Sequence, residues 1–94
     1  MADRFTLVWT AHFARTAKKF AQGNPGLKTR FARVLRDLER DPFAPHLKLH
    51  HLKGALAGLQ AVSITHGYRL TLTLKITAKE IILLDVGSHD VVYR

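Results

Sequence analysis

Side chains that can transfer protons or bind phosphate are concentrated in two segments of this 94-residue chain. The first segment combines basic and imidazole groups, at Lys48, His50, His51 and Lys53. The second joins the polar face of a predicted strand to the C-terminal tail, and it carries Arg69, His89, Tyr93 and Arg94. If the last strands fold back on one another, the face that carries Arg69 lies near the start of the tail.

These residue types suit cleavage of RNA. The ribose 2′-hydroxyl already lies next to the phosphate, so cleavage requires proton transfer and charge stabilisation but no metal. Histidine can transfer both protons because its usual pKa of about 6.5 lies near working pH. Arginine binds two phosphoryl oxygens at once, lysine adds positive charge, and tyrosine can stack on a base. The general base remains open between His50 or His51 and His89.

The same residues also have interpretations that involve no chemistry. The two neighbouring histidines could be solvated loop residues, and the two lysines could be ordinary surface charges. Arg69 begins the polar side of an amphipathic strand, where a surface arginine is common. His89 and Tyr93 could only cap or pack the C-terminus. Composition and pattern alone therefore predict a basic domain with a nucleic-acid partner and no more.

A metal site or cofactor is not predicted. His46, His50 and His51 are close in sequence, but Pro45 disfavours the helix that would place ligands four residues apart on one face. No acidic ligand is near them in sequence, and the chain has no cysteine. The absence of cysteine also excludes disulfides and cysteine nucleophiles.

The charge balance indicates a polyanionic partner. Fifteen lysines and arginines face seven acidic residues, which gives a formal net charge of +8. Such a field attracts nucleic acid, an anionic membrane or an acidic protein. No stretch reaches the ~20 apolar residues of a membrane span, and the N-terminus lacks the apolar region of a signal peptide. We expect a cytoplasmic protein.

The N-terminal half predicts a strand followed by two helices. Residues 5–10 alternate, with Phe5, Leu7 and Trp9 expected to face inward. Thr10 is expected to cap a helix whose apolar stripe includes Phe13 and which ends at Gly23. The second helix is expected to have Asn24 as its N-cap and Pro25 at its first position, and to end at Asp41-Pro42. Its apolar stripe consists of Leu27, Phe31, Val34, Leu35 and Leu38.

The C-terminal half predicts three strands. Residues 42–57 are expected to be irregular. Val62 and Ile64 lie on one face of a strand, and His66-Gly67 is expected to form a tight turn. Residues 70–76 alternate, with their leucines and Ile76 on the buried face and polar residues opposite. Residues 81–84 form an apolar run expected in a central strand covered on both faces, ending at Gly87. The order β-α-α-β-β-β predicts a single α+β domain over residues 1–94, a helical hairpin on a mainly antiparallel sheet.

Several short motifs follow one another in this half of the chain, each occurring once. They are Leu52-Lys53-Gly54, Leu59, Ser63, Gly67-Tyr68-Arg69-Leu70 and the segment 81–94. In this order and spacing, within a small basic chain, they resemble toxins of the RelE/ParE superfamily, particularly the YafQ-type and related RelE-like branch. Residue-level similarity mainly spans residues 48–94, and the order of elements agrees along the whole chain.

The resemblance implies a fold of two helices on a twisted, mainly antiparallel sheet. It implies a ribosome-dependent endoribonuclease that cuts mRNA in the A site, or a ParE-like inhibitor of DNA gyrase, or an inactive homologue. It also implies a cognate antitoxin with an extended segment. Arg69, His89 and Tyr93 match the family's catalytic or phosphate-binding positions, and the basic segment 48–53 matches its binding stretch. Ser63 and Gly67 fall where the YafQ-type pattern has a histidine and an acidic residue.

Overall fold

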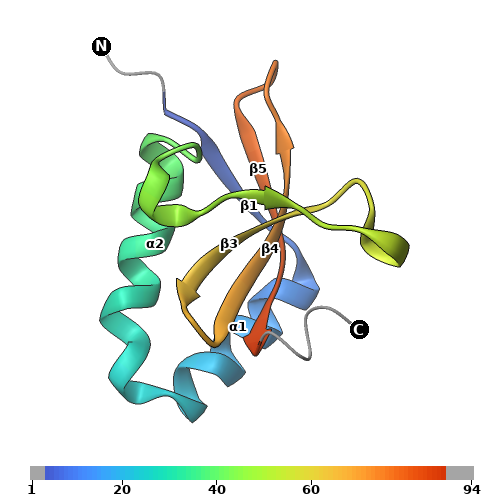
Figure 1. The fold of residues 1–94 in the computed structure, drawn as a ribbon. Helices are drawn as coiled ribbons and strands as arrows, with labels where there is room; N and C mark the ends of the chain where they lie inside the picture. Colours follow the sequence, from blue (N-terminus) through green and yellow to red (C-terminus); the bar gives the residue numbers. More distant parts are fainter. Residues whose placement is uncertain (1–3, 89–94) are drawn as a thin grey trace.

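Two helices and a five-stranded sheet make up the part of the chain that the computed structural model describes, residues 4–88 (Figure 1). The helices are α1 (Ala11–Gly23) and α2 (Lys28–Arg40). The strands are β1 (Thr6–Trp9), β2 (His50–His51), β3 (Gln60–Thr65), β4 (Tyr68–Lys75) and β5 (Glu80–Ser88). Their order in the sheet is β1-β5-β4-β3-β2, and only the β1–β5 pair is parallel. The predicted α+β class is confirmed.

The helices cover one face of this sheet. Phe31 of α2 lies between two rings of α1, with centroids 6.3 Å from Phe13 and 5.2 Å from Phe20. These rings share one core with buried residues of β3, β4 and β5, which are Val62, Ile64, Leu70, Leu72, Ile81, Leu83 and Val86. Because side chains alternate along a strand, the neighbouring polar positions point to the opposite face. That opposite face carries the candidate site.

Thr10 begins α1 as predicted and also fixes it to the sheet. Its hydroxyl oxygen accepts a hydrogen bond from the Phe13 backbone N–H at 3.1 Å. The same hydroxyl donates to the backbone carbonyl of Leu83 in β5 at 2.8 Å. One side chain therefore satisfies a free amide at the helix start and a strand carbonyl.

Replacing Thr10 by valine, which keeps the shape but removes the hydroxyl, is expected to lower the free energy of unfolding by about 2 kcal/mol. The loss combines the helix cap with the hydrogen bond to Leu83. Thr10→Ser keeps both bonds and is expected to retain most of the stability. Urea unfolding of the two variants measures the difference, and equal stabilities would refute this role for the hydroxyl.

The connection between the helices differs from the prediction. The Asn24 side chain does not cap the second helix; its amide donates back to the Phe20 carbonyl at the end of α1, at 3.0 Å. A 3-10 turn, Pro25–Leu27, follows, and α2 starts only at Lys28. Pro25 does occupy the first position of that turn. The end of α2 at Arg40 agrees with the predicted stop before Pro42.

Residues 42–57 are more ordered than predicted. They contain two 3-10 turns, Pro45–Leu47 and Gly54–Leu56, and the short strand β2 between them. Strand β2 pairs with β3, His50 opposite Ala61 and His51 opposite Gln60. The two histidines therefore lie on an edge strand and not in a loop. The sheet has a fifth strand that hydrophobic periodicity does not predict.

Three further expectations about burial are wrong. Trp9 is 49% exposed, because β1 is an edge strand and the indole packs edge-on against Phe13. Ile76 is also 49% exposed, because it follows the end of β4. Ile82 and Leu84 are only partly buried, so β5 is fully covered on one face alone. Strand β5 also continues through Gly87 to Ser88. Between residues 4 and 88, no helix is both long and apolar enough to cross a membrane.

Candidate active site

His50 and Arg69, two of the predicted catalytic residues, are in direct contact. A guanidinium nitrogen, Nη1 of Arg69, donates to Nε2 of His50 at 3.0 Å. The other ring nitrogen, Nδ1, lies 2.9 Å from the backbone carbonyl of Lys48. A carbonyl only accepts and a guanidinium only donates, so in this arrangement Nδ1 carries the proton and Nε2 accepts. The imidazole is fixed at both nitrogens, with Nε2 directed to the Arg69 guanidinium.

The backbone at Lys48 orients the imidazole of His50. Lys48 has left-handed dihedral angles, φ 55° and ψ 45°, directly after the Pro45–Leu47 turn. Such angles are uncommon outside glycine, and here they turn the chain into β2 and expose the carbonyl that holds His50. The buried Leu47 anchors the turn in the core. The segment 45–50 is therefore a bend that presents Lys48 and His50 together.

The sheet register places Arg69 in the same region. Arg69 lies on β4 between Ser63 of β3 and Gly87 of β5. On the face opposite the helices, His50 of β2 lies opposite Ala61 of β3. On the same face, Ser63 of β3 lies opposite Arg69 of β4. Gly87 of β5 is the register partner of Arg69, so the described chain ends one residue beyond this position. His89 and Tyr93 lie outside the described residues, so their predicted roles remain predictions.

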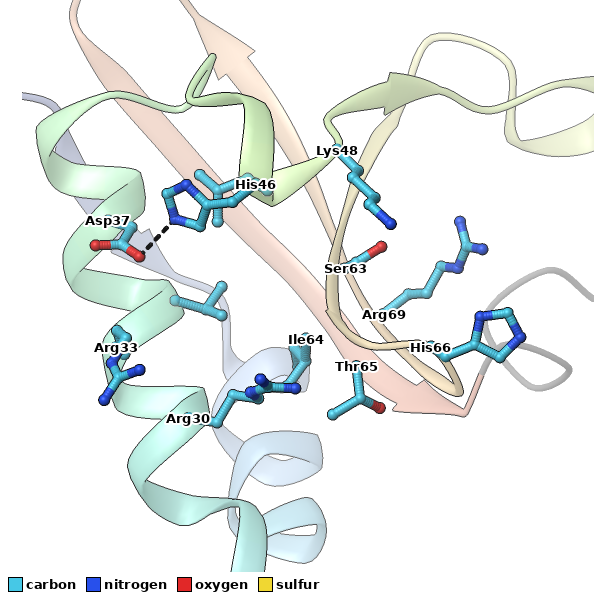
Figure 2. A pocket seen from close by; sticks show the side chains of 12 residues that line it. Arg30, Arg33, Asp37, His46, Lys48, Ser63, Ile64, Thr65, His66 and Arg69 are labelled. Carbon is cyan, nitrogen blue, oxygen red and sulfur yellow. Dashed lines mark hydrogen bonds and ion pairs between the residues drawn. The ribbon is translucent and has the colours of Figure 1, made fainter.

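A groove of about 550 Å³ opens beside this pair, between α2 and the β3–β4 hairpin (Figure 2). Arg69 and Lys48 line one side, and Arg30 and Arg33 of α2 line the other. Its polar rim is completed by Asp37, His46, Ser63, Thr65 and His66. Four arginine and lysine side chains thus face one concave space with a single carboxylate among them. The groove is suited to a polyanion.

The carboxylate in the groove already has a partner. Asp37 Oδ2 lies 2.8 Å from Nε2 of His46, and this contact joins α2 to the Pro45–Leu47 turn (Figure 2). The sequence suggests His46 only as a possible metal ligand, and its pairing with Asp37 is not predicted. The available signal was the spacing of Arg30, Arg33 and Asp37, which share a helix face at i, i+3 and i+7. Within residues 4–88, no cluster of three histidine or acidic side chains could hold a metal ion.

The other two predicted binding residues lie apart from the groove. His51 is exposed, and its Nδ1 lies 3.3 Å from the Gln60 side-chain amide. Lys53 is exposed at the start of the Gly54–Leu56 turn. Neither lines the groove. The structure therefore brings together Lys48, His50 and Arg69 and separates His51 and Lys53 from them.

Several solved toxin structures have the same architecture. The E. coli DinJ–YafQ toxin–antitoxin complex contains a chain that matches with a TM-score of 0.77 and 15% identity, over 97% of this chain and 99% of that chain. The YoeB/ParE toxin from Agrobacterium tumefaciens matches with a TM-score of 0.74 and 22% identity, over 90% and 99%. A chain of the Mycobacterium tuberculosis RelBE2 toxin–antitoxin complex matches with a TM-score of 0.68 and 22% identity, over 92% of this chain and 99% of that chain.

This chain has the RelE/ParE toxin fold. At these identities the similarity establishes the fold alone. No family model and no curated protein sequence matches the chain. The RelE/ParE fold predicted from the motifs of residues 48–94 is thus confirmed by the structure. Nearly the full length of each matched toxin chain is covered, so the fold extends over the whole of those chains.

Proposed function

We propose that this protein is the toxin of a type II toxin–antitoxin pair, and that it cleaves mRNA in the ribosomal A site in the cytoplasm. The observation that carries the proposal is the contact between His50 and Arg69 at the rim of a cationic groove. A proton acceptor in contact with a phosphate-binding group is what RNA cleavage requires. A protein that only inhibits another by binding needs no such pair.

The proposed reaction uses the RNA's own 2′-hydroxyl. A phosphate that binds Arg69 takes over guanidinium donors, which releases Nε2 of His50 to accept the 2′-hydroxyl proton. The 2′-oxygen then forms a bond to phosphorus while the bond from phosphorus to the 5′-oxygen breaks. The products are a 2′,3′-cyclic phosphate and a 5′-hydroxyl end. Arg69 and Lys48 stabilise the charge that develops on the phosphoryl oxygens.

The remaining roles follow from the family resemblance. His89 is assigned to deliver the proton to the leaving 5′-oxygen, and Tyr93 to stack on a base. His51 and Lys53, which lie apart from the groove, are assigned to more distant phosphates of the RNA or ribosome. No cofactor takes part in the proposed reaction, and no metal is assigned to it.

The proposed protein partner is a cognate antitoxin. The net charge of +8 favours an acidic segment as a ligand as well as RNA. Two of the structural neighbours were solved as toxin–antitoxin complexes, which supports a complex of the same kind here. An acidic protein encoded by the adjacent reading frame would be the candidate partner.

The proposal is tested by comparing two targets with the same purified protein. We expect cleavage of mRNA on translating ribosomes, little cleavage of the same mRNA without ribosomes, and no effect on supercoiling by DNA gyrase. Ribosome dependence is expected because a small enzyme with few functional groups gains much of its rate from substrate positioning. Inhibition of gyrase without RNA cleavage would contradict the proposal and establish the ParE-like alternative.

A further inference from the structure

The α2 side of the groove beside the candidate active site has no part in the proposed reaction. We propose that Arg30 and Arg33 form a second phosphate site, which binds the RNA backbone next to the nucleotide held at Arg69. The inference takes RNA as the ligand from the proposed function. It adds that α2 binds the substrate and determines its path across the protein.

The position of the two arginines supports this site. They are exposed residues three positions apart on α2, so they lie on one face of the helix, and both line the groove. In Figure 2, Arg30 extends from α2 toward the β3 side of the groove, near Ile64. Arg69 and Lys48 line the opposite side. A chain bound between these walls meets cations on both.

The charges fit more than one phosphate. The groove has four arginine and lysine side chains and one carboxylate, which is hydrogen-bonded to His46. Two cations per wall match one phosphate per wall, because a phosphate accepts several charge-assisted hydrogen bonds. A single phosphate at Arg69 would leave the α2 cations without an anion.

The floor of the groove favours a nucleotide over an acidic peptide. Val34, Leu47 and Ile64 also line the groove, but each is at most 6% exposed because it belongs to the hydrophobic core. The aliphatic stems of the arginine and lysine side chains supply the remaining apolar surface, which a ribose or the face of a base can cover while its flanking phosphates reach the walls. An acidic side chain brings a charge but little apolar area. Single-stranded RNA is therefore the ligand that matches both parts of the groove.

The test measures binding separately from cleavage. The probe is a fluorescent 2′-O-methyl RNA of eight nucleotides, which lacks the nucleophile and cannot be cut. Arg30→Ala/Arg33→Ala is expected to weaken its binding by at least about tenfold at about 0.1 M salt, where the Debye length is about 10 Å. Loss of the one phosphate held by this pair is also expected to reduce the slope of log K against log salt by about 0.7.

A matched control removes the same charge from the same helix. Lys28 and Arg36 are exposed on α2 and do not line the groove. Lys28→Ala/Arg36→Ala is expected to change affinity by less than about threefold and to leave the slope unaltered, because distant exposed charges are screened. Both variants place alanine in a helix, where it is favourable, and circular dichroism checks their fold.

Equal losses in the two double variants would overturn the site, since net charge alone would then explain binding. So would a failure of the parent protein to bind the probe. An oligoglutamate that binds as tightly as RNA, with the same dependence on Arg30 and Arg33, would identify an acidic protein as the ligand and also overturn the proposal. RNA binding that depends on Arg30 and Arg33, without cleavage on ribosomes, would refute the nuclease but keep the site. Cleavage on ribosomes, together with RNA binding that does not depend on Arg30 and Arg33, would refute the site but keep the nuclease.

Discussion

His50→Ala is expected to reduce the rate of mRNA cleavage on ribosomes by about 10²- to 10⁴-fold, the usual contribution of a general base. The ring is fixed by the Lys48 carbonyl and by Arg69, so its proton-accepting nitrogen has a defined position beside the guanidinium that is proposed to bind phosphate. The measurement is a single-turnover cleavage rate with saturating toxin. Undiminished cleavage by a folded variant would exclude His50 from the mechanism.

A second substitution separates proton transfer from positioning. The side-chain oxygen of glutamine can occupy the place of Nε2 and accept from Arg69, but it cannot take a proton at neutral pH. We expect His50→Gln to be nearly as slow as His50→Ala. We also expect added imidazole to restore part of the rate to the alanine variant only. Full activity of His50→Gln would show that the histidine acts only by holding Arg69.

Two other histidines complete this comparison. His12 lies on α1 beside Asp85 and does not line the groove, so His12→Ala controls for the loss of a surface histidine. It is expected to cleave at the parent rate. His89→Ala is expected to abolish translation arrest in cells and to leave the fold intact, because His89 is assigned to the leaving oxygen. Full arrest by that variant would remove His89 from the mechanism.

The start of α1 and its buried face can be predicted from local sequence patterns. The spacing of Phe13, Ala17 and Phe20, by four and then three residues, identifies the buried face of α1, and all three residues are buried. Thr10 is recognisable as a cap because it stands between an alternating segment and a helical one. Such features depend on neighbours along the chain, so they can be inferred without the tertiary structure.

The features that were missed depend on distant partners. Strand β2 has only two residues, both polar, and exists because His50 and His51 pair with residues 60 and 61 of β3. Trp9 is exposed because β1 lies at the edge of the sheet, a position that alternation does not reveal. Periodicity shows that Arg30 and Arg33 lie off the apolar stripe of α2. Only the packing of α2 beside the β3–β4 hairpin directs them into a groove.

In the candidate site, too, the sequence predicts some features and only the fold reveals the others. The residue types and the family resemblance indicated His50, Arg69 and Lys48, and the structure places them together. They did not distinguish these residues from His51 and Lys53, which are equally close in sequence. The difference arises from alternation along β2: His50 faces Arg69, whereas His51 meets Gln60. A one-residue shift in register would exchange the two histidines.

Arg69→Met is expected to reduce the cleavage rate by about 10²- to 10³-fold, the typical effect of losing a donor to the transition state. Methionine fills much of the space of the half-buried arginine stem, so packing is largely retained. Arg69→Lys keeps the charge but loses the two-pronged contact, and we expect it to recover only part of the rate. Single-turnover rates and urea unfolding are measured on the same preparations.

Lys75→Met is the matched control for the charge that Arg69→Met removes. Lys75 is an exposed cation at the other end of β4, six residues from Arg69 and therefore about 20 Å away. Lys75→Met removes the same charge from the same strand and is expected to keep the parent rate. If both variants lost activity equally, the net positive field would account for the effect of Arg69. A rate loss confined to Arg69, together with the loss in His50→Gln, would establish that the two residues in contact act on one phosphate.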